Sequence, residues 1–337
     1  MHITFLTRFD GGLYYGGAEV QTEETARYLR ALGMRVDFLT PLSREVGDIV
    51  HGFGAYPYFD SVAKYCRSRC KPFILSTIFY KDTSSLRLRL RYQIYKLFPR
   101  SMPRFRSLRR LFRHVRMFLP NTHAEAIQLQ QIFRISDHRI EVVPNGVEAR
   151  FAQADPDWFR RETGIREPFV LCVGRIEPRK NQHRLIQALS GTKIPLVLIG
   201  NPLSNDYLAL CRELADDRVY FLPAVPHDSP LLAGAYAACR VFALPSLLET
   251  PGIAALEAGV AGARVVVTPY GGAREYFGDY ALYPEPRSVQ SIRQAVLQAW
   301  ETPHAPDILK QHLLTHYSWE TVAQKTLQVY QRVLAES

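Results

Sequence analysis

Residues 2–40 read HITFLTRFDGGLYYGGAEVQTEETARYLRALGMRVDFLT, and they carry the clearest structural signal in the chain. The stretch opens with an apolar run at 2–7 and passes through a glycine-rich loop at 10–17. Residues 18–32 then place apolar side chains at helical spacing, and a second apolar run follows at 36–40. The order strand, helix, strand predicts a βαβ unit and therefore a parallel sheet.

The same alternation of short apolar runs and helical patterns continues along the chain and restarts after a turn signal at Pro144-Asn145-Gly146. Two such series predict an α/β fold with two facing, doubly wound, Rossmann-like domains. Ligands of such sheets bind beyond the carboxyl ends of the strands, so we expect the site in the cleft between the domains. The expected division is 1–148, 149–316 and a closing amphipathic helix at 317–337.

The composition is that of a globular protein, with 47% apolar and 22% charged residues among 337. Five scattered cysteines do not form a disulfide framework, which favours a reducing cytoplasm. The apolar opening meets Arg8 and Asp10 too early for a signal peptide. No run approaches the roughly 18 apolar residues that a membrane-spanning helix needs. A cytoplasmic location is therefore expected.

The stretch 246–259, SLLETPGIAALEAG, follows a predicted strand and opens a helix near Gly252. The start of a helix offers free N–H groups and the positive end of the helix dipole, which suit a phosphate group. Glu249 precedes this point and Glu257 follows it, so a carboxylate lies on either side to accept sugar hydroxyls. The alternative is that both glutamates make ordinary solvated ion pairs.

Two further loops also join a strand to a helix. Arg175 and Lys180 follow the predicted strand 169–173 and would face the phosphates, where fixed cations stabilise developing negative charge. Gly16 and Gly17 close the first loop, where glycines permit close approach of backbone to a ligand. The spacing is not that of a dinucleotide fingerprint. Solvent-facing charges and a simple turn are the alternatives for these two loops.

These motifs together resemble the GT-B glycosyltransferases of family 4, the retaining group that includes many bacterial polysaccharide and lipid glycosyltransferases. The resemblance covers nearly the whole chain and keeps the family's order, which is far more specific than any single motif. The motifs are Gly16-Gly17-Ala18-Glu19, Val143-Pro144-Asn145-Gly146-Val147, Val173-Gly174-Arg175 with Lys180-Asn181, Leu244-Pro245-Ser246, Glu249 with Glu257, Gly271-Gly272-Ala273-Arg274-Glu275 and Tyr317-Ser318-Trp319.

The resemblance implies a metal-independent, retaining transfer from a UDP- or GDP-linked sugar, with no cofactor. Arg175 and Lys180 would hold the donor diphosphate, and Glu249 would bind sugar hydroxyls and assist the reacting centre. Glu257 would hold the ribose. The implied attack is on the same face, and the leaving phosphate accepts the acceptor's proton. The other implied donor contacts are Gly16, Gly17, Thr250, Pro251, Gly252 and Ile253.

The chain departs from the family pattern at two places. Many members carry a histidine after the strand that corresponds to 73–77, where this chain reads Ser76-Thr77-Ile78-Phe79. Thr77 and His51 are therefore the candidates on the acceptor side, with an ordinary partly buried histidine as the alternative. The usual glycine near the base-binding strand is replaced by Leu222-Pro223-Ala224, which leaves the base open.

Residues 64–116 hold sixteen Lys or Arg and one acid, whereas the whole chain has a net charge of +10, so the rest is net acidic. Basic amphipathic helices can lie on anionic membranes. We expect a peripheral position on the inner face of the cell membrane and a lipid-linked glycan as acceptor in surface polysaccharide assembly. An apolar stripe packed on the sheet is the alternative. The candidate membrane contacts are Arg87, Arg91, Lys96, Arg109, Arg110 and Arg113.

Two rival functions remain open at this point. An Arg-rich segment and a pI near 9.4 also suit a nucleic-acid- or membrane-binding protein without transferase activity. The GT-B fold also occurs in sugar-nucleotide epimerases and phosphorylases. The presence of Arg175, Lys180, Glu249 and Glu257 together favours the transferase, and no specific nucleic-acid partner is expected.

Overall fold

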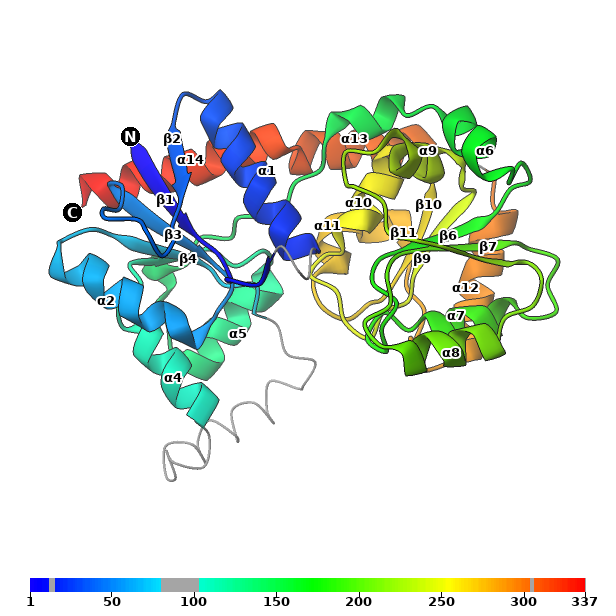
Figure 1. Ribbon diagram of the computed structural model, residues 1–337, viewed down its shortest axis with the longest axis horizontal. Coiled ribbons are helices and arrows are strands. Elements are labelled where there is room, and N and C mark those ends of the chain that lie inside the picture. Colours follow the sequence, from blue (N-terminus) through cyan, green and yellow to red (C-terminus); the bar gives the residue numbers. More distant parts are fainter. Residues whose placement is uncertain (12–15, 80–102, 304–305, 337) are drawn as a thin grey trace. The chain divides into compact units, whose positions relative to one another are not determined.

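The chain folds into two compact units, each with its own parallel sheet (Figure 1). Unit 1 combines residues 1–146 with 319–337, and unit 2 holds residues 147–318. The predicted α/β class with two Rossmann-like domains is confirmed. The computed structural model describes residues 1–11, 16–79, 103–303 and 306–336.

The chain passes from unit 1 to unit 2 between Gly146 and Val147, and returns between Ser318 and Trp319. The sequence led us to expect a division at 148/149 and a separate closing helix from 317. In the structure that helix is part of unit 1.

The sheet of unit 1 has the strand order β2-β1-β3-β4-β5 in the described residues, and all pairs are parallel. The strands are β1 His2–Leu6, β2 Arg35–Phe38, β3 Ile49–Phe53, β4 Phe73–Ser76 and β5 Met117–Phe118. The helices are α1 Gly17–Ala31, η2 Pro57–Phe59, α2 Asp60–Ser68, α4 Pro103–Phe112, α5 His123–Phe133, η4 Asp137–Arg139 and α14 Trp319–Ala335.

Side chains alternate across the strands of unit 1 and therefore build a core on each face of the sheet. Ile3, Phe5 and Ile74 face one core, which α1 and α14 cover with residues such as Leu29 and Tyr330. The helices α2, α4 and α5 cover the other face, where Phe73 and Leu75 lie. The helices α1 and α14 pack side by side, although nearly the whole chain separates them in sequence (Figure 1).

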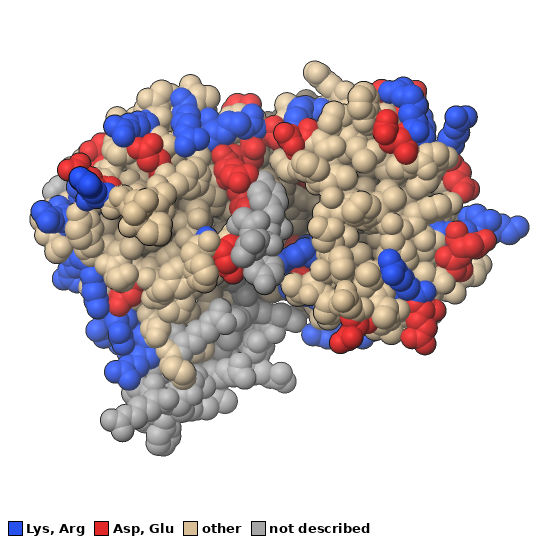
Figure 2. Space-filling model, viewed as in Figure 1, with Lys and Arg blue, Asp and Glu red and all other residues tan. Residues whose placement is uncertain are grey.

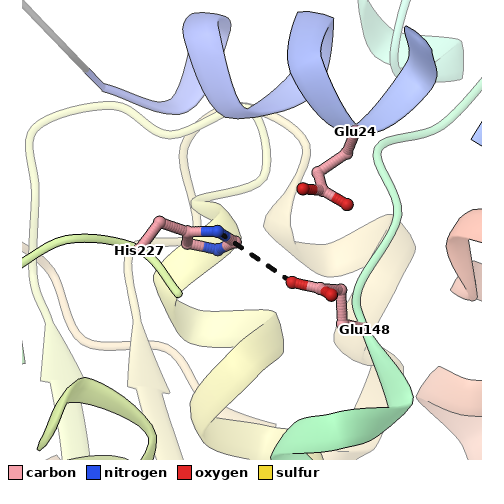
Figure 3. A group of neighbouring side chains, drawn as sticks. All are labelled: Glu24, Glu148 and His227. Carbon is pink, nitrogen blue, oxygen red and sulfur yellow. Dashed lines mark ion pairs between the residues drawn. The ribbon is translucent and has the colours of Figure 1, made fainter. Parts of the chain in front are cut away.

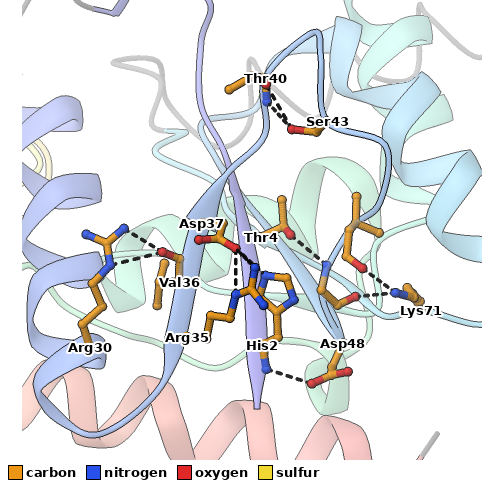
Figure 4. Close-up of polar contacts among 12 residues, drawn as sticks. His2, Thr4, Arg30, Arg35, Val36, Asp37, Thr40, Ser43, Asp48 and Lys71 are labelled. Carbon is orange, nitrogen blue, oxygen red and sulfur yellow. Dashed lines mark hydrogen bonds and ion pairs between the residues drawn. The ribbon is translucent and has the colours of Figure 1, made fainter.

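Polar contacts hold the amino ends of these strands in register (Figure 4). His2 Nε2 lies 2.8 Å from Asp37 Oδ2 on the neighbouring strand β2. The backbone N–H of His2 donates to Asp48, which precedes β3, and the N–H of Gly47 donates to Thr4 Oγ1. These contacts lie at the end of the sheet opposite to the carboxyl ends of the strands, and we infer that they stabilise the fold of unit 1.

The sheet of unit 2 has the order β11-β10-β9-β6-β7-β8 in the described residues. Its strands are β6 Val170–Val173, β7 Leu196–Ile199, β8 Val219–Leu222, β9 Val241–Leu244, β10 Arg264–Val267 and β11 Ala281–Leu282. Its helices are η5 Ala149–Gln153, α6 Pro156–Thr163, α7 Gln182–Leu189, α8 Asn205–Glu213, α9 Pro230–Ala238, α10 Ile253–Val260, α11 Ala273–Phe277, η6 Gly278–Tyr280, α12 Val289–Glu301 and α13 Pro306–Tyr317.

The helices of unit 2 begin where the sequence supplies caps. Ser204, Ser229 and Ser288 each accept a hydrogen bond from a backbone N–H in the first turn of α8, α9 and α12. One continuous apolar core joins these helices to the sheet. Among the helices of the described stretches, none is both long and apolar enough to cross a bilayer.

Candidate functional site

A cluster of charged side chains in unit 2 lies at the carboxyl ends of β6 and β9. These strands are neighbours in the sheet, so the loops that follow them meet, although Lys180 and Glu249 are 69 positions apart. Lys180 Nζ donates to Glu249 Oε1 at 2.7 Å, and both side chains are largely buried. Arg179 Nη1 lies 3.4 Å from the same oxygen. The structure thus brings together two predicted site residues and adds Arg179, which the sequence did not single out.

Backbone contacts fix the loop that carries Glu249. Its N–H donates to the carbonyl of Tyr270, and its carbonyl accepts from Gly272, so the loop after β10 holds it from the other side. Gly271 has φ +104°, and a Cβ there would lie 1.8 Å from the Glu249 carbonyl oxygen. The 271–275 motif therefore has a local function, because only glycine permits this approach.

Asn181 ties the Lys180 loop to the same edge of the sheet. It lies in the left-handed region at φ +65° and is fully buried. Its Nδ2 donates to the carbonyls of Pro245 and Pro286, at 2.9 and 2.7 Å. A side-chain amide with two donors suits this position, because it satisfies two carbonyls at once.

The pKa of Glu249 is below its ordinary value. Burial alone would raise this pKa, but the charges of Lys180 and Arg179 and the hydrogen bond from Lys180 outweigh burial. Glu249 is therefore ionised at neutral pH and acts as an acceptor of hydrogen bonds.

Arg175, the other predicted cation of this site, differs from Lys180 and Arg179 in its contacts. It is half-buried, and within the described part of the chain its guanidinium makes no ion pair or hydrogen bond.

The helix α10 starts directly after this loop, at Ile253. Gly252 precedes it at φ +87°, and a Cβ there would lie 3.1 Å from Leu244 Cδ2 and 3.4 Å from Glu249 Oε2. Thr250 and Pro251 complete the turn between Glu249 and the helix. The first N–H groups of a helix have no acceptor within it. This turn therefore places backbone donors beside an ionised carboxylate and Lys180.

Glu257 lies in the second turn of α10 and is 3% exposed. Its Oε1 lies 2.5 Å from His227 Nε2, and its Oε2 accepts a hydrogen bond of 2.8 Å from the hydroxyl of Tyr236. His227 Nδ1 also lies 4.0 Å from Glu148 Oε1, and Figure 3 shows this ion pair. The sequence singled out neither His227 nor Tyr236, because they are 30 and 21 positions away from Glu257.

Two of the predicted site residues of unit 1, Gly16 and Gly17, lie at the start of α1. Gly17 is the first residue of α1 and Gly16 precedes it, and the carbonyl of Gly16 accepts from the N–H groups of Glu19 and Val20. Glu19 in turn pairs with Arg8 at 2.8 Å. The backbone at the start of α1 is thus ordered by its own contacts.

His51 and Thr77 are buried inside unit 1, at 1% and 0% exposure. His51 Nδ1 lies 2.6 Å from the Tyr330 hydroxyl, and Nε2 lies 2.9 Å from Ser76 Oγ. Burial lowers the pKa of His51 to about 3, so the ring is neutral. Thr77 donates to Glu125. These contacts hold both side chains inside unit 1, and a role of either residue toward the acceptor stays a prediction.

The basic candidates are only partly described. Arg109, Arg110 and Arg113 are exposed on α4 and the turn that follows it. Arg87, Arg91 and Lys96 lie outside the described residues. The helix α4 packs against α2, whose exposed face carries Lys64 and Arg67. Figure 2 shows Lys and Arg side chains along the edge of unit 1 that bears these two helices.

Comparisons with known proteins agree with this architecture. Residues 157–312 match the family described as Glycosyl transferases group 1, and residues 42–151 match Glycosyltransferase Family 4. The fold is similar to sucrose-phosphate synthase from Thermosynechococcus elongatus, with a TM-score of 0.80, 18% identity and 100% of both chains covered. It is also similar to Anabaena HepE, solved with UDP and glucose, with a TM-score of 0.74, 19% identity and 98% and 100% coverage.

Two parallel α/β units with these neighbours define the GT-B class of glycosyltransferase folds. With one family model matching each unit, the chain belongs to the family 4 type of GT-B glycosyltransferases.

Curated relatives that match part of the chain are also named glycosyltransferases. A glycosyltransferase of Methanocaldococcus jannaschii is 32% identical over 218 residues, which are 59% of this chain and 55% of that protein. The D-inositol 3-phosphate glycosyltransferase of Kribbella flavida is 30% identical over 236 residues, which are 63% of this chain and 55% of that protein. The chain thus spans about half the length of these curated relatives.

Proposed function

We propose that this chain transfers a sugar from a nucleotide-sugar donor to an acceptor, with retention of configuration and without a metal ion. The observation that carries this proposal is the cluster at the start of α10. An ionised, buried Glu249, its partner Lys180 and the N-terminus of α10 meet there. This combination suits a ligand with hydroxyls next to a diphosphate, as a nucleotide-sugar has.

The cations of unit 2 supply the electrostatic part of the proposed reaction. The bond between the anomeric carbon and the diphosphate oxygen breaks, and that oxygen gains negative charge. Arg175 has no partner of its own among the described residues and, with Lys180, would stabilise this charge. The acceptor oxygen bonds to the same face of the sugar, and its proton passes to the leaving diphosphate.

Two carboxylates would hold the donor's hydroxyls. Glu249 is ionised and lies beside the reacting end, and it would accept from the sugar. Glu257 lies further along α10 and would accept from the ribose. The solved structure of Anabaena HepE contains UDP and glucose, which makes UDP the first nucleotide to test, with GDP as the alternative.

A thermal-shift panel of UDP, GDP, ADP and their sugar conjugates tests this proposal. A ligand at 100 times its dissociation constant stabilises the folded state by about 2.7 kcal/mol, which shifts melting visibly. We expect one nucleotide to stabilise the wild type and Glu257→Ala to lose that response. Glu213→Ala changes an exposed glutamate on α8 of the same unit and should keep it.

A wild type that responds to no nucleotide at millimolar concentration would contradict the donor site. If the same protein shifted duplex DNA in a gel at about 150 mM salt, the nucleic-acid alternative would gain support. Transfer from the stabilising nucleotide-sugar, followed by analysis of the anomeric configuration with and without a chelator, tests retention and metal independence.

We also propose that unit 1 docks on the anionic inner face of the cell membrane, where a lipid-linked glycan would be the acceptor. The exposed basic face of α2 and α4 supports this proposal (Figure 2). Each Lys or Arg near such a surface contributes about 1 kcal/mol. The acceptor would then lie in the membrane beside the bound enzyme.

Sedimentation with vesicles of phosphatidylglycerol and phosphatidylcholine tests the docking. We expect binding that weakens as salt rises, and a marked loss in the variant R109S/R110S/R113S. A control variant removes the same charge from exposed positions of unit 2, R161S/R166S/R212S, and should bind as the wild type does. Binding that does not depend on salt, or equal losses in both variants, would contradict the proposed surface.

A further inference from the structure

Glu257 is held by two donors that do not belong to its own helix. His227 lies in the loop between β8 and α9, and its Nε2 is 2.5 Å from Glu257 Oε1. Tyr236 lies on α9, and its hydroxyl donates to Glu257 Oε2 at 2.8 Å. A carboxylate offers about four acceptor positions, two on each oxygen. These contacts use one position on each oxygen and leave one on each.

The anchors of Glu257 are themselves fixed. Arg150 on η5 donates to the His227 carbonyl at 2.8 Å and to Glu148 Oε1 at 2.9 Å. The Phe151 ring packs edge-on against both His227 and Tyr236. The side chains of His227 and Glu257 are 16% and 4% exposed, so water competes little for their contact.

This geometry suits a ligand with two adjacent hydroxyls, as a ribose has. Two adjacent hydroxyls of a ribose can each donate to one oxygen of a carboxylate, provided the carboxylate plane is held still. A free glutamate side chain would lose rotational freedom on binding, which reduces affinity. A carboxylate already held from the other side by an imidazole and a phenol has lost that freedom before the ligand arrives.

We propose that His227 is the positioning residue that fixes the Glu257 carboxylate for the 2′- and 3′-hydroxyls of the donor's ribose, with Tyr236 as the second anchor. This inference rests on the proposed function, because it assigns the ribose to Glu257. It goes further in naming the residues that make the site select a ribonucleotide over a deoxyribonucleotide.

The test compares UDP with 2′-deoxy-UDP, and GDP with 2′-deoxy-GDP, by calorimetric titration of the full chain. We expect the wild type to prefer one ribonucleotide over its deoxy form by about tenfold or more. His227→Leu removes the donor and keeps bulk, so the preference should fall to less than threefold. This fall should come from weaker binding of the ribonucleotide, with little change for the deoxy form.

His227→Gln should keep most of the preference, because its amide nitrogen can still donate to Glu257. A general loss of packing would not be rescued in this way. His312→Leu is the matched control, since His312 is a half-buried histidine of unit 2 that makes a hydrogen bond to the Tyr276 carbonyl. It should keep the full preference. If His227→Leu does not fold, Tyr236→Phe removes the other donor, and the preference should fall at least threefold.

The outcomes separate this inference from the proposed function. A wild type that binds none of the four nucleotides would overturn the proposed function and the inference with it. A wild type that prefers the ribonucleotide, together with a folded His227→Leu variant that keeps that preference, would overturn only the role of His227.

Discussion

At the scale of single residues, the Lys180–Glu249 pair determines how the candidate site depends on charge. Both side chains are mostly buried, and Arg179 is the second cation on the same oxygen. Removing one partner of a buried pair leaves the other charge uncompensated, which costs about 3–5 kcal/mol. We expect Lys180→Met to lower the unfolding free energy by about 3 kcal/mol, the lower end of that range, because Arg179 remains. Urea unfolding measures this change.

The same variant should change the dependence of stability on pH. Because the folded pKa of Glu249 is lowered, its ionisation stabilises the fold above the unfolded pKa, and this contribution is lost as pH falls through the folded pKa. Without Lys180 that loss should begin at higher pH. Lys310→Met breaks a surface pair with Asp307, whose side chain is 86% exposed, and should change the unfolding free energy by no more than about 0.5 kcal/mol. Equal stability of Lys180→Met and Lys310→Met would show that the buried pair contributes nothing.

At the scale of elements, the loops after β9 and β10 depend on glycine. Gly271→Ala combines a positive φ with a Cβ that would lie 1.8 Å from the Glu249 carbonyl oxygen, so the Glu249 loop must move. We expect a loss of about 3 kcal/mol in unfolding free energy, within the range of strained and overpacked positions. The response to the nucleotide should be lost as well. Urea unfolding and thermal shift measure the two effects.

Gly191→Ala is the matched control for this prediction. Gly191 also has a positive φ, +71°, but a Cβ there would meet nothing within 4 Å. The substitution should lower the unfolding free energy only by the backbone strain, about 1–2 kcal/mol, and should leave nucleotide binding intact. If both variants lost the same stability and both bound nucleotide, the close approach of Gly271 to Glu249 would have no effect.

The elements also show how far the sequence could predict the molecule. The alternation of apolar runs and helical patterns predicted both parallel sheets, because these patterns reflect local burial. The motif loops predicted that Lys180 and Glu249 each follow a strand, whereas the neighbourhood of those two strands, β6 and β9, is seen only in the sheet. His227, Tyr236 and Arg179 were not predicted, because their roles depend on tertiary contacts. No periodicity links His227 to Glu257 across α9 and β9.

The same limit applied to α14. Its amphipathic pattern predicted a helix but held no information about which core its apolar face would join. His51 shows the same limit, since its place in an apolar run suggested chemistry, whereas its contacts with Tyr330 and Ser76 could not be read from the local pattern.

At the scale of the whole molecule, the last helix makes unit 1 depend on both ends of the chain. Trp319, Val322, Val329 and Tyr330 are buried in the core that also contains Ile3 and Phe5. The Trp319 ring packs so closely on Gly146 that a Cβ there would lie 2.4 Å from it. Unit 2 has a separate core, to which α14 contributes nothing among the described residues.

Truncation after Ser318 should therefore affect the two units differently. We expect scanning calorimetry of the wild type to show one transition for each unit. In the truncated chain the transition of unit 1 should be lost, or its midpoint should fall by about 10 °C or more, which corresponds to a loss of unfolding free energy on the order of several kcal/mol. The transition of unit 2 should stay.

Leu313→Ala, which opens a cavity between α13 and α10, assigns that transition to unit 2 by lowering its midpoint alone. Tyr330→Phe removes only the hydroxyl that contacts His51 and should lower the unit 1 transition slightly, by about 1 kcal/mol. If truncation lowered both transitions equally, α14 would have to stabilise more than the core of unit 1, and the division into two independent cores would be wrong.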